Sequence, residues 1–149
     1  MHLNDLKREV KLLIKEHGIK VTRAKFKSPA GRAWVQDRII KIPKMDSFQA
    51  VGTTIHEVAH IILNHPDDYE DYLREYETER WTIKYLKKHD MHKDYKVEFN
   101  QLVENSKLYV QSHLERYITR SKKKGIEPKI KKSVLKWLNC EIYNQKKDY

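Results

Sequence analysis

The spacing of apolar residues divides the chain into a first helix, a group of short strands and several further helices. Apolar residues recur three and four positions apart over residues 6–14, and Gly18 follows where a helix C-cap is expected. Looser alternation of apolar and polar residues, interrupted by turn residues, then predicts three short strands, over residues 19–26, 33–36 and 38–42. We expect these strands to pair as an antiparallel sheet.

Helical spacing returns after the last predicted strand. Asp46, with Gln49 three residues later, forms a capping box for a helix that runs to about Leu63, where the sequence Asn-His-Pro stops it. Three more helices are predicted, over residues 66–89, 98–124 and 130–138. The expected fold class is therefore α+β: mainly helical, with a small three-stranded antiparallel sheet before the first of these later helices.

That helix carries His56 and His60 four positions apart, with Glu57 directly after the first. Residues four apart lie on one helix face about one turn from each other, so both rings can bind one Zn²⁺. Glu57 projects to the side, where it can reach a metal-bound water without binding the metal; this is the H-E-x-x-H pattern. The neighbouring residues are apolar, and buried imidazoles and carboxylates need partners. Hydrogen bonds to nearby carbonyls are the alternative to a metal.

A catalytic zinc needs a third protein ligand. His65 follows His60 by five residues, without the glycine and the spacing of the metzincin pattern, so we interpret it as a residue at the helix end. The next predicted helix offers Glu75, Glu77 and Glu79. Its apolar residues place Glu77 and Glu79 near the margins of the buried side and Glu75 away from it. Periodicity does not choose between Glu77 and Glu79.

The charge of the chain is uneven. The 149 residues carry a net charge of +10, and from Ser106 onward there are 12 Lys/Arg against 4 Asp/Glu. We divide the chain into a core over residues 1–97 and a basic helical segment over residues 98–149, packed on that core or appended to it. Such a segment favours contact with nucleic acid or an acidic protein; the alternative is a solvated face that keeps the protein soluble.

The composition is that of a globular protein, with 39% hydrophobic residues. No apolar run approaches the roughly 18 residues that a membrane span needs. The N-terminus lacks the apolar core of a signal peptide. The single cysteine, Cys140, cannot form an internal disulfide, and we interpret it as a small core residue. We expect a soluble, cytoplasmic protein.

The motif and the glutamate-rich segment after it resemble a known family. The sequence HEVAHIILNHP, followed by EYETERWTIKYL, is similar to the ImmA/IrrE-type zinc metallopeptidases, which are small bacterial and phage-borne proteins. The resemblance covers roughly residues 32–86. It places Glu77 at the ligand glutamate and Trp81 at an aromatic position four residues later. Thr78 stands where alanine is usual, which is a departure from the family pattern.

The resemblance implies a gluzincin-like site. His56, His60 and Glu77 would bind Zn²⁺, and Glu57 would be the general base for hydrolysis of a peptide bond. The strand over residues 38–42 would align the substrate by main-chain pairing. Some family members cleave a regulator, which predicts a site-specific endopeptidase acting on a repressor-like, DNA-bound protein of a phage or mobile element.

Two other interpretations stay open. The protein could be a nucleic-acid-binding accessory protein whose zinc site is structural or vestigial, with phosphates bound by Lys122, Lys123, Lys124, Lys129, Lys131 and Lys132. It could also be a protein–protein regulator that uses the scaffold without turnover. Glu57 argues against this last interpretation, because a structural site needs no general base. Structural zinc sites also favour cysteine-rich ligand sets, which this chain lacks.

Overall fold

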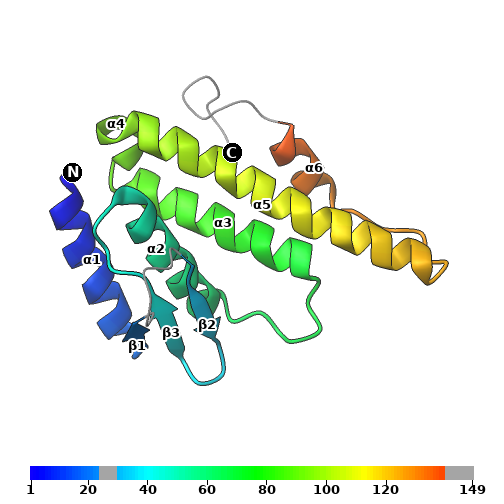
Figure 1. Cartoon of the computed structure of the whole chain (residues 1–149), viewed down its shortest axis with the longest axis horizontal. Coiled ribbons are helices and arrows are strands. Elements are labelled where there is room, and N and C mark those ends of the chain that lie inside the picture. The colour runs from blue at the N-terminus through cyan, green and yellow to red at the C-terminus, as the bar shows by residue number, and fades with distance from the viewer. Residues whose placement is uncertain (24–29, 140–149) are drawn as a thin grey trace.

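Helices make up most of the protein, and one small sheet lies beside them (Figure 1). The structure is a computed structural model that describes residues 1–23 and 30–139, so Cys140 lies outside it. Along the chain the elements are α1 (Leu3–Glu16), β1 (Lys20–Arg23), β2 (Arg32–Trp34), β3 (Ile39–Ile42), α2 (Phe48–Leu63), α3 (Asp71–Lys88), α4 (Met91–Asp94), α5 (Lys96–Lys123) and α6 (Lys132–Leu138). The predicted α+β class is confirmed.

The sheet differs from the prediction in strand direction. Its order is β1-β3-β2, with β1 parallel and β2 antiparallel to β3. The sheet is therefore mixed, and the prediction of an antiparallel sheet is wrong. Burial explains the arrangement: Ile40 and Ile42 of β3 are 0% and 1% exposed, whereas every residue of β1 is exposed. The most apolar strand takes the middle of the sheet, so the chain forms both edges before it fills the centre.

We predicted that the strand over residues 38–42 would align a substrate, but this strand is β3, which lies in the middle of the sheet. Ile40 pairs with Val21 of β1 on one side and with Ala33 of β2 on the other. Because both sides of β3 are occupied, a further peptide strand can pair only with an outer edge of the sheet. Of the two outer strands, β2 packs against α2, which carries the histidines.

Helix α2 is held at both ends. Its N-cap is Ser47 rather than Asp46, and the Ser47 hydroxyl accepts a hydrogen bond from the backbone N–H of Ala50 at 3.1 Å. Asn64 ends the helix in the left-handed conformation, with φ of 47°, and its N–H donates to the carbonyl of His60. Five apolar residues of α2 are no more than 1% exposed: Val51, Ile55, Val58, Ala59 and Ile61. This burial fixes the directions in which the two histidines point.

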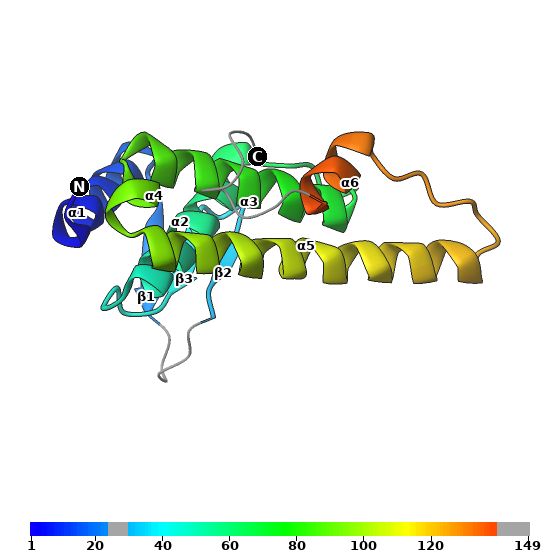
Figure 2. The same cartoon turned by 90° about the horizontal axis from the view of Figure 1, so that it is seen from above.

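Helix α5 joins the core to the C-terminal part of the chain. It begins at Lys96, so the boundary predicted between residues 97 and 98 falls in its first turn. It contributes Phe99, Leu102, Val103 and Val110 to the same hydrophobic core as α1 and α2. Its second half runs on past α3, and the chain then returns to α6 (Figure 2). Within the described residues, no helix is both long enough and apolar enough to cross a membrane.

Candidate metal centre

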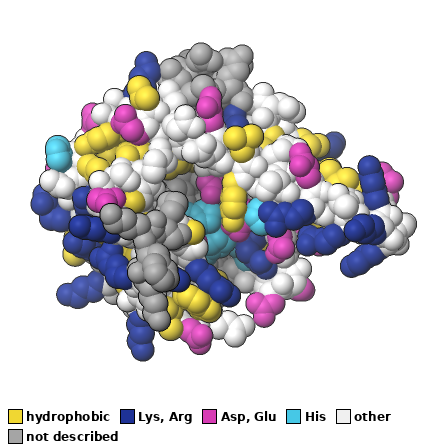
Figure 3. All heavy atoms as spheres, viewed as in Figure 1, with side chains coloured by type: hydrophobic (Ala, Val, Ile, Leu, Met, Phe, Trp, Pro, Cys, Tyr) yellow, Lys and Arg dark blue, Asp and Glu magenta, His cyan; other side chains and the backbone are white. Residues whose placement is uncertain are grey.

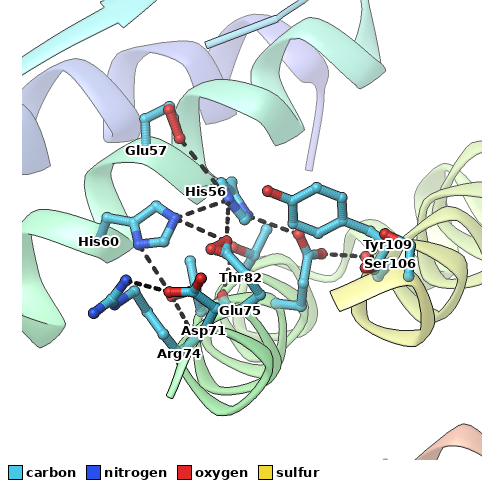
Figure 4. Close-up of polar contacts among 12 residues, drawn as sticks. His56, Glu57, His60, Asp71, Arg74, Glu75, Thr82, Ser106 and Tyr109 are labelled. Atoms are coloured by element: carbon cyan, nitrogen blue, oxygen red, sulfur yellow. Dashed lines mark hydrogen bonds and ion pairs between the residues drawn. The ribbon is translucent and has the colours of Figure 1, made fainter. Parts of the chain in front are cut away.

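His56 and His60 meet through the same nitrogen of each ring. Their Nε2 atoms lie 3.1 Å apart, and the rings pack edge to face with centroids 4.7 Å apart (Figure 4). Both side chains are largely buried, at 15% and 12% exposure. The predicted pair is therefore close enough for one ion to contact both nitrogens.

Glu75 of α3 completes a triangle with the two histidines. Its Oε1 lies 3.3 Å from Nε2 of His56 and 3.0 Å from Nε2 of His60. A tetrahedral zinc site with bonds of about 2.0–2.1 Å separates its ligand atoms by about 3.3–3.4 Å, close to these distances. Burial alone would raise the pKa of Glu75, but the contacts with His56 and His60 outweigh it and lower that pKa well below its usual range. The donor set and its spacing therefore fit a zinc ion.

A second carboxylate holds the other side of the His56 ring. Oε1 of Glu79 lies 2.7 Å from Nδ1 of His56, and the Ser106 hydroxyl of α5 donates a hydrogen bond to Oε2 of Glu79. Burial lowers the pKa of His56, but Glu79 and Glu75 oppose it more strongly and raise the pKa well above its ordinary value. In metal sites a carboxylate on the far ring nitrogen fixes the orientation and tautomer of the ligand histidine. Glu79 is placed to fix the His56 ring in this way.

Glu57 sits beside the triangle rather than in it. The ligand atoms of His56, Glu57 and His60 all lie within 4.8 Å of one another, so this group could hold a metal ion. However, Oε1 of Glu57 is 3.8 Å from Nε2 of His56, further than the 3.3 Å of Glu75. We therefore assign Glu75 as the closer ligand candidate. Burial raises the pKa of Glu57, and Oε2 of Glu57 has no hydrogen-bond partner among the described residues.

Gly31 makes room for Glu57, a role that the sequence did not reveal. A Cβ atom at Gly31 would lie 2.7 Å from Cγ of Glu57 and 3.1 Å from the carbonyl oxygen of Lys41. Side chains do not approach one another so closely, so any larger residue would displace Glu57 or the strand. In the sequence this glycine belongs to a Ser-Pro-Ala-Gly-Arg turn, and nothing local marks its contact with α2.

Glu77, the predicted third ligand, lies elsewhere. Its Oε1 is 3.0 Å from Nε2 of His65, and its other oxygen accepts a hydrogen bond from the Tyr69 hydroxyl. The rings of His65 and Tyr69 stack with centroids 4.5 Å apart. The structure thus brings His56, His60 and Glu57 together as predicted, and it places Glu75 rather than Glu77 beside the two histidines.

The error has a physical origin in the buried face of α3. Apolar residues predicted where this face lies, but the face is largely polar where it meets α2. Its buried residues are Tyr72, Glu75, Thr78, Glu79, Thr82, Ile83 and Leu86. Glu75 and Glu79 are one turn apart and point the same way, whereas Glu77 is two positions from each and points away. The spacing of Glu75, Thr78, Glu79 and Thr82 is a helical polar stripe, and that signal was available in the sequence.

Tyr109 of α5 closes the site from the side opposite Glu57 (Figure 4). Its ring meets the His56 ring edge-on, with centroids 5.8 Å apart. Although the residue is 42% exposed, partial burial of its hydroxyl, together with the charges of Glu75 and Glu79, raises the pKa of Tyr109 well above its ordinary value. The hydroxyl therefore stays protonated at neutral pH and can donate a hydrogen bond. Tyr109 is one of the apolar residues whose spacing predicts the helix over residues 98–124, and that spacing gave no sign of this position.

The site lies where two cavities meet. One, of about 400 Å³, includes Gly52, Thr53 and Asn105 in its walls; the other, of about 450 Å³, includes Arg32 and Ala33 of β2. Four residues line both cavities: Gly31, His56, Glu57 and Tyr109. Histidine side chains are visible near the centre of the face shown in Figure 3. The arrangement can receive an extended molecule that continues on both sides of the histidines.

Comparison with known proteins adds no identification. No family model, no curated protein and no solved structure matches the chain significantly. The resemblance to the ImmA/IrrE-type metallopeptidases stays a prediction, and the function has to be argued from the site.

Proposed function

We propose that this protein is a zinc-dependent endopeptidase with a gluzincin-like site, and that His56, His60 and Glu75 hold the metal. The observation that carries the proposal is the triangle of two Nε2 atoms and one carboxylate oxygen, with sides of 3.0–3.3 Å. When bound there, Zn²⁺ would act as a Lewis acid that activates water and polarises a peptide carbonyl. The buried Glu57 beside the triangle separates this arrangement from a purely structural site, which needs no additional base.

Glu57 is the general base in this proposal. Burial raises the pKa of Glu57. The raised pKa is closer to neutral pH, where a general base works best. Glu57 takes one proton from the attacking water as the oxygen bonds to the carbonyl carbon. The same proton then passes to the amide nitrogen as the C–N bond breaks, and Glu57 returns to its ionised form.

Tyr109 and β2 position the peptide. The protonated Tyr109 hydroxyl can donate a hydrogen bond to the carbonyl oxygen on which negative charge develops. The outer edge of β2 offers main-chain groups to an extended peptide, a common way of holding a substrate strand. Because cavities lie on both sides of His56, a chain can continue in both directions, which favours an endopeptidase over an enzyme that trims chain ends.

The resemblance to the ImmA/IrrE-type proteins supports a narrower form of the proposal. The substrate would be a specific repressor-like regulator of a phage or mobile element. Incubation with candidate regulators, followed by mass spectrometry, tests this form. Zinc-dependent cleavage of one regulator at one bond would support it, and equal cleavage of every unfolded protein would contradict it.

The first test is metal content together with peptide cleavage. We expect about one zinc per chain by elemental analysis and zinc-dependent hydrolysis of a mixed peptide library. Glu57→Gln should keep the zinc and lower cleavage by about 10²–10⁴-fold, because general bases typically contribute that much. Absence of zinc after reconstitution would overturn the proposal. Unchanged cleavage by the Glu57→Gln variant would remove Glu57 as the base.

A further inference from the structure

The end of the molecule formed by the last turns of α5 and the segment leading to α6 concentrates positive charge. Residues 122–132 contain Glu127 and six lysines: Lys122, Lys123, Lys124, Lys129, Lys131 and Lys132. All six lysines are exposed. We call this surface the basic end. In Figure 3 dark blue side chains gather at this end of the molecule.

The backbone of the basic end is held in place by two tyrosines. The Tyr72 hydroxyl of α3 donates to the carbonyl of Lys129 at 3.3 Å and accepts from the N–H of Lys131 at 3.2 Å. The Tyr117 hydroxyl of α5 accepts from the N–H of Lys129 at 3.1 Å. The two tyrosine rings pack with centroids 4.9 Å apart. The return segment is therefore fixed against α3 and α5.

We propose that the basic end binds duplex DNA by contacting the phosphate backbone of the DNA. Dense, exposed lysines match the charge of phosphates, and such contacts release counterions from the nucleic acid. The projecting end of α5 is also a suitable shape, because a helix about 10–12 Å in diameter fits the major groove of B-DNA, about 12 Å wide. The lysines form no base-reading motif, so binding would be independent of sequence.

Two observations favour a duplex over single-stranded nucleic acid or RNA. Single strands are usually bound by exposed aromatic rings on which bases stack. Here Trp137 is 2% exposed and Tyr117 packs on Tyr72, so these rings serve the fold. Among the described residues from the end of α5 through α6, the exposed large apolar residues are Ile126 and Leu135, which offer no stacking surface. A-form RNA presents a deep, narrow major groove that a helix does not enter.

Fluorescence anisotropy of the full chain with a labelled random duplex of about 20 base pairs, two helical turns, tests the proposal. We expect binding at low salt, with log affinity falling by about 0.9 per phosphate contact for each unit of log salt. Replacing Lys122, Lys123 and Lys124 by Gln should weaken binding and reduce that slope by about two to three. No binding at about 50 mM salt would overturn the proposal.

A matched control removes the same charge elsewhere. Lys11, Lys15 and Lys20 are exposed lysines of the N-terminal part of the chain, at the other end of the molecule in Figure 1. Replacing these three by Gln should leave the affinity within about twofold of the wild type if the basic end is the site. Equal losses from both triple variants would mean that net charge alone attracts DNA, which would overturn the proposal. So would displacement of the DNA by polyglutamate at an equal concentration of charge.

Tyr117→Phe tests the ordered backbone separately from the charge. It removes the hydrogen bond to Lys129 and keeps every lysine, so we expect binding several-fold weaker with the salt slope unchanged. The proposal does not depend on the metal site. Glu75→Gln should bind DNA like the wild type, so failure of DNA binding and failure of the endopeptidase proposal are separate results.

Discussion

The candidate metal site and the basic end both concentrate charge, but the charges are buried at the first and exposed at the second. At the site, Glu75 and Glu79 are buried and lie 2.7–3.3 Å from histidine nitrogens. At the basic end, the lysines are exposed to solvent. A buried ion loses several kcal/mol of solvation and must recover it from specific partners, whereas exposed charges are screened and act collectively. Single substitutions should therefore have large effects at the site and small ones at the basic end.

The sharpest test of this contrast lies within α3, where neighbouring glutamates have different surroundings. Glu75→Gln should weaken zinc binding by at least about 100-fold, more than the 10–100-fold that outer partners of a metal site supply. Glu77→Gln should leave the affinity within about threefold, because Glu77 contacts His65 and Tyr69 instead. Competition with a chromophoric chelator measures both affinities.

The Glu77→Gln variant is the matched control, since it makes the same chemical change two residues away on the same helix. Circular dichroism should show equal helix content in both variants. A larger loss of zinc affinity in Glu77→Gln than in Glu75→Gln would return Glu77 to the ligand set and contradict the geometry described here.

Glu79→Gln should have the next largest effect. The amide keeps the size of the side chain but loses the charge that faces Nδ1 of His56, so zinc affinity should fall by about 10–100-fold. Ser106→Ala, which removes the hydroxyl that donates to Glu79, should lower it by less. The same titration measures both variants. An unchanged affinity in Glu79→Gln would show that the orientation of His56 does not depend on this carboxylate.

Zinc binding should release a proton. In the zinc-free protein the carboxylates Glu79 and Glu75 overcome burial and raise the pKa of His56 well above 6.5, so its ring is protonated at pH 7. The ring must be neutral to bind zinc. Affinity should therefore rise about tenfold per pH unit up to that pKa. Calorimetry in buffers of different ionisation enthalpy should show about one proton released per zinc at pH 7; a value near zero would contradict the raised pKa.

The same shift has a defined sign for the stability of the zinc-free protein. Because the pKa of His56 is raised on folding, its protonated ring stabilises the fold fully below about pH 6.5, the unfolded pKa. This stabilisation is lost as the pH rises through the folded pKa. Glu75 acts in the opposite direction: its lowered pKa stabilises the fold above its unfolded pKa and loses this effect in acid.

The sequence predicted the parts of the site that depend on local geometry. His56, Glu57 and His60 lie within one helix, where spacing alone determines which side chains meet. Glu75 was missed because the prediction took burial to mean apolar residues, and the buried side of α3 is polar where it faces the histidines. The fold shows the same division between local and non-local features. The helices other than α4, and the strands, were found from their periodicity, but the parallel pairing of β1 with β3 joins separate segments that periodicity does not relate.

Gly31 and Tyr109 show the same limit at the level of single residues. Each meets the site from outside α2, Gly31 from the position just before β2 and Tyr109 from α5. Their neighbours along the chain gave no sign of the contact, since one belonged to a turn and the other to an apolar helix face. Such roles follow from how helices and strands pack, and the spacing of residues within one segment does not encode them.

The smallest predicted effect concerns the stability of the basic end. Replacing Lys122, Lys123 and Lys124 by Gln should change the free energy of unfolding by about 1 kcal/mol or less in total, because exposed side chains away from special features each contribute within about 0.5 kcal/mol. The variant should be slightly more stable than the wild type, because like charges repel one another in the folded state. Urea unfolding of the zinc-free protein measures this. A loss above about 2 kcal/mol would mean that these lysines pack against the fold through their aliphatic stems, and they would then not be held available for phosphates.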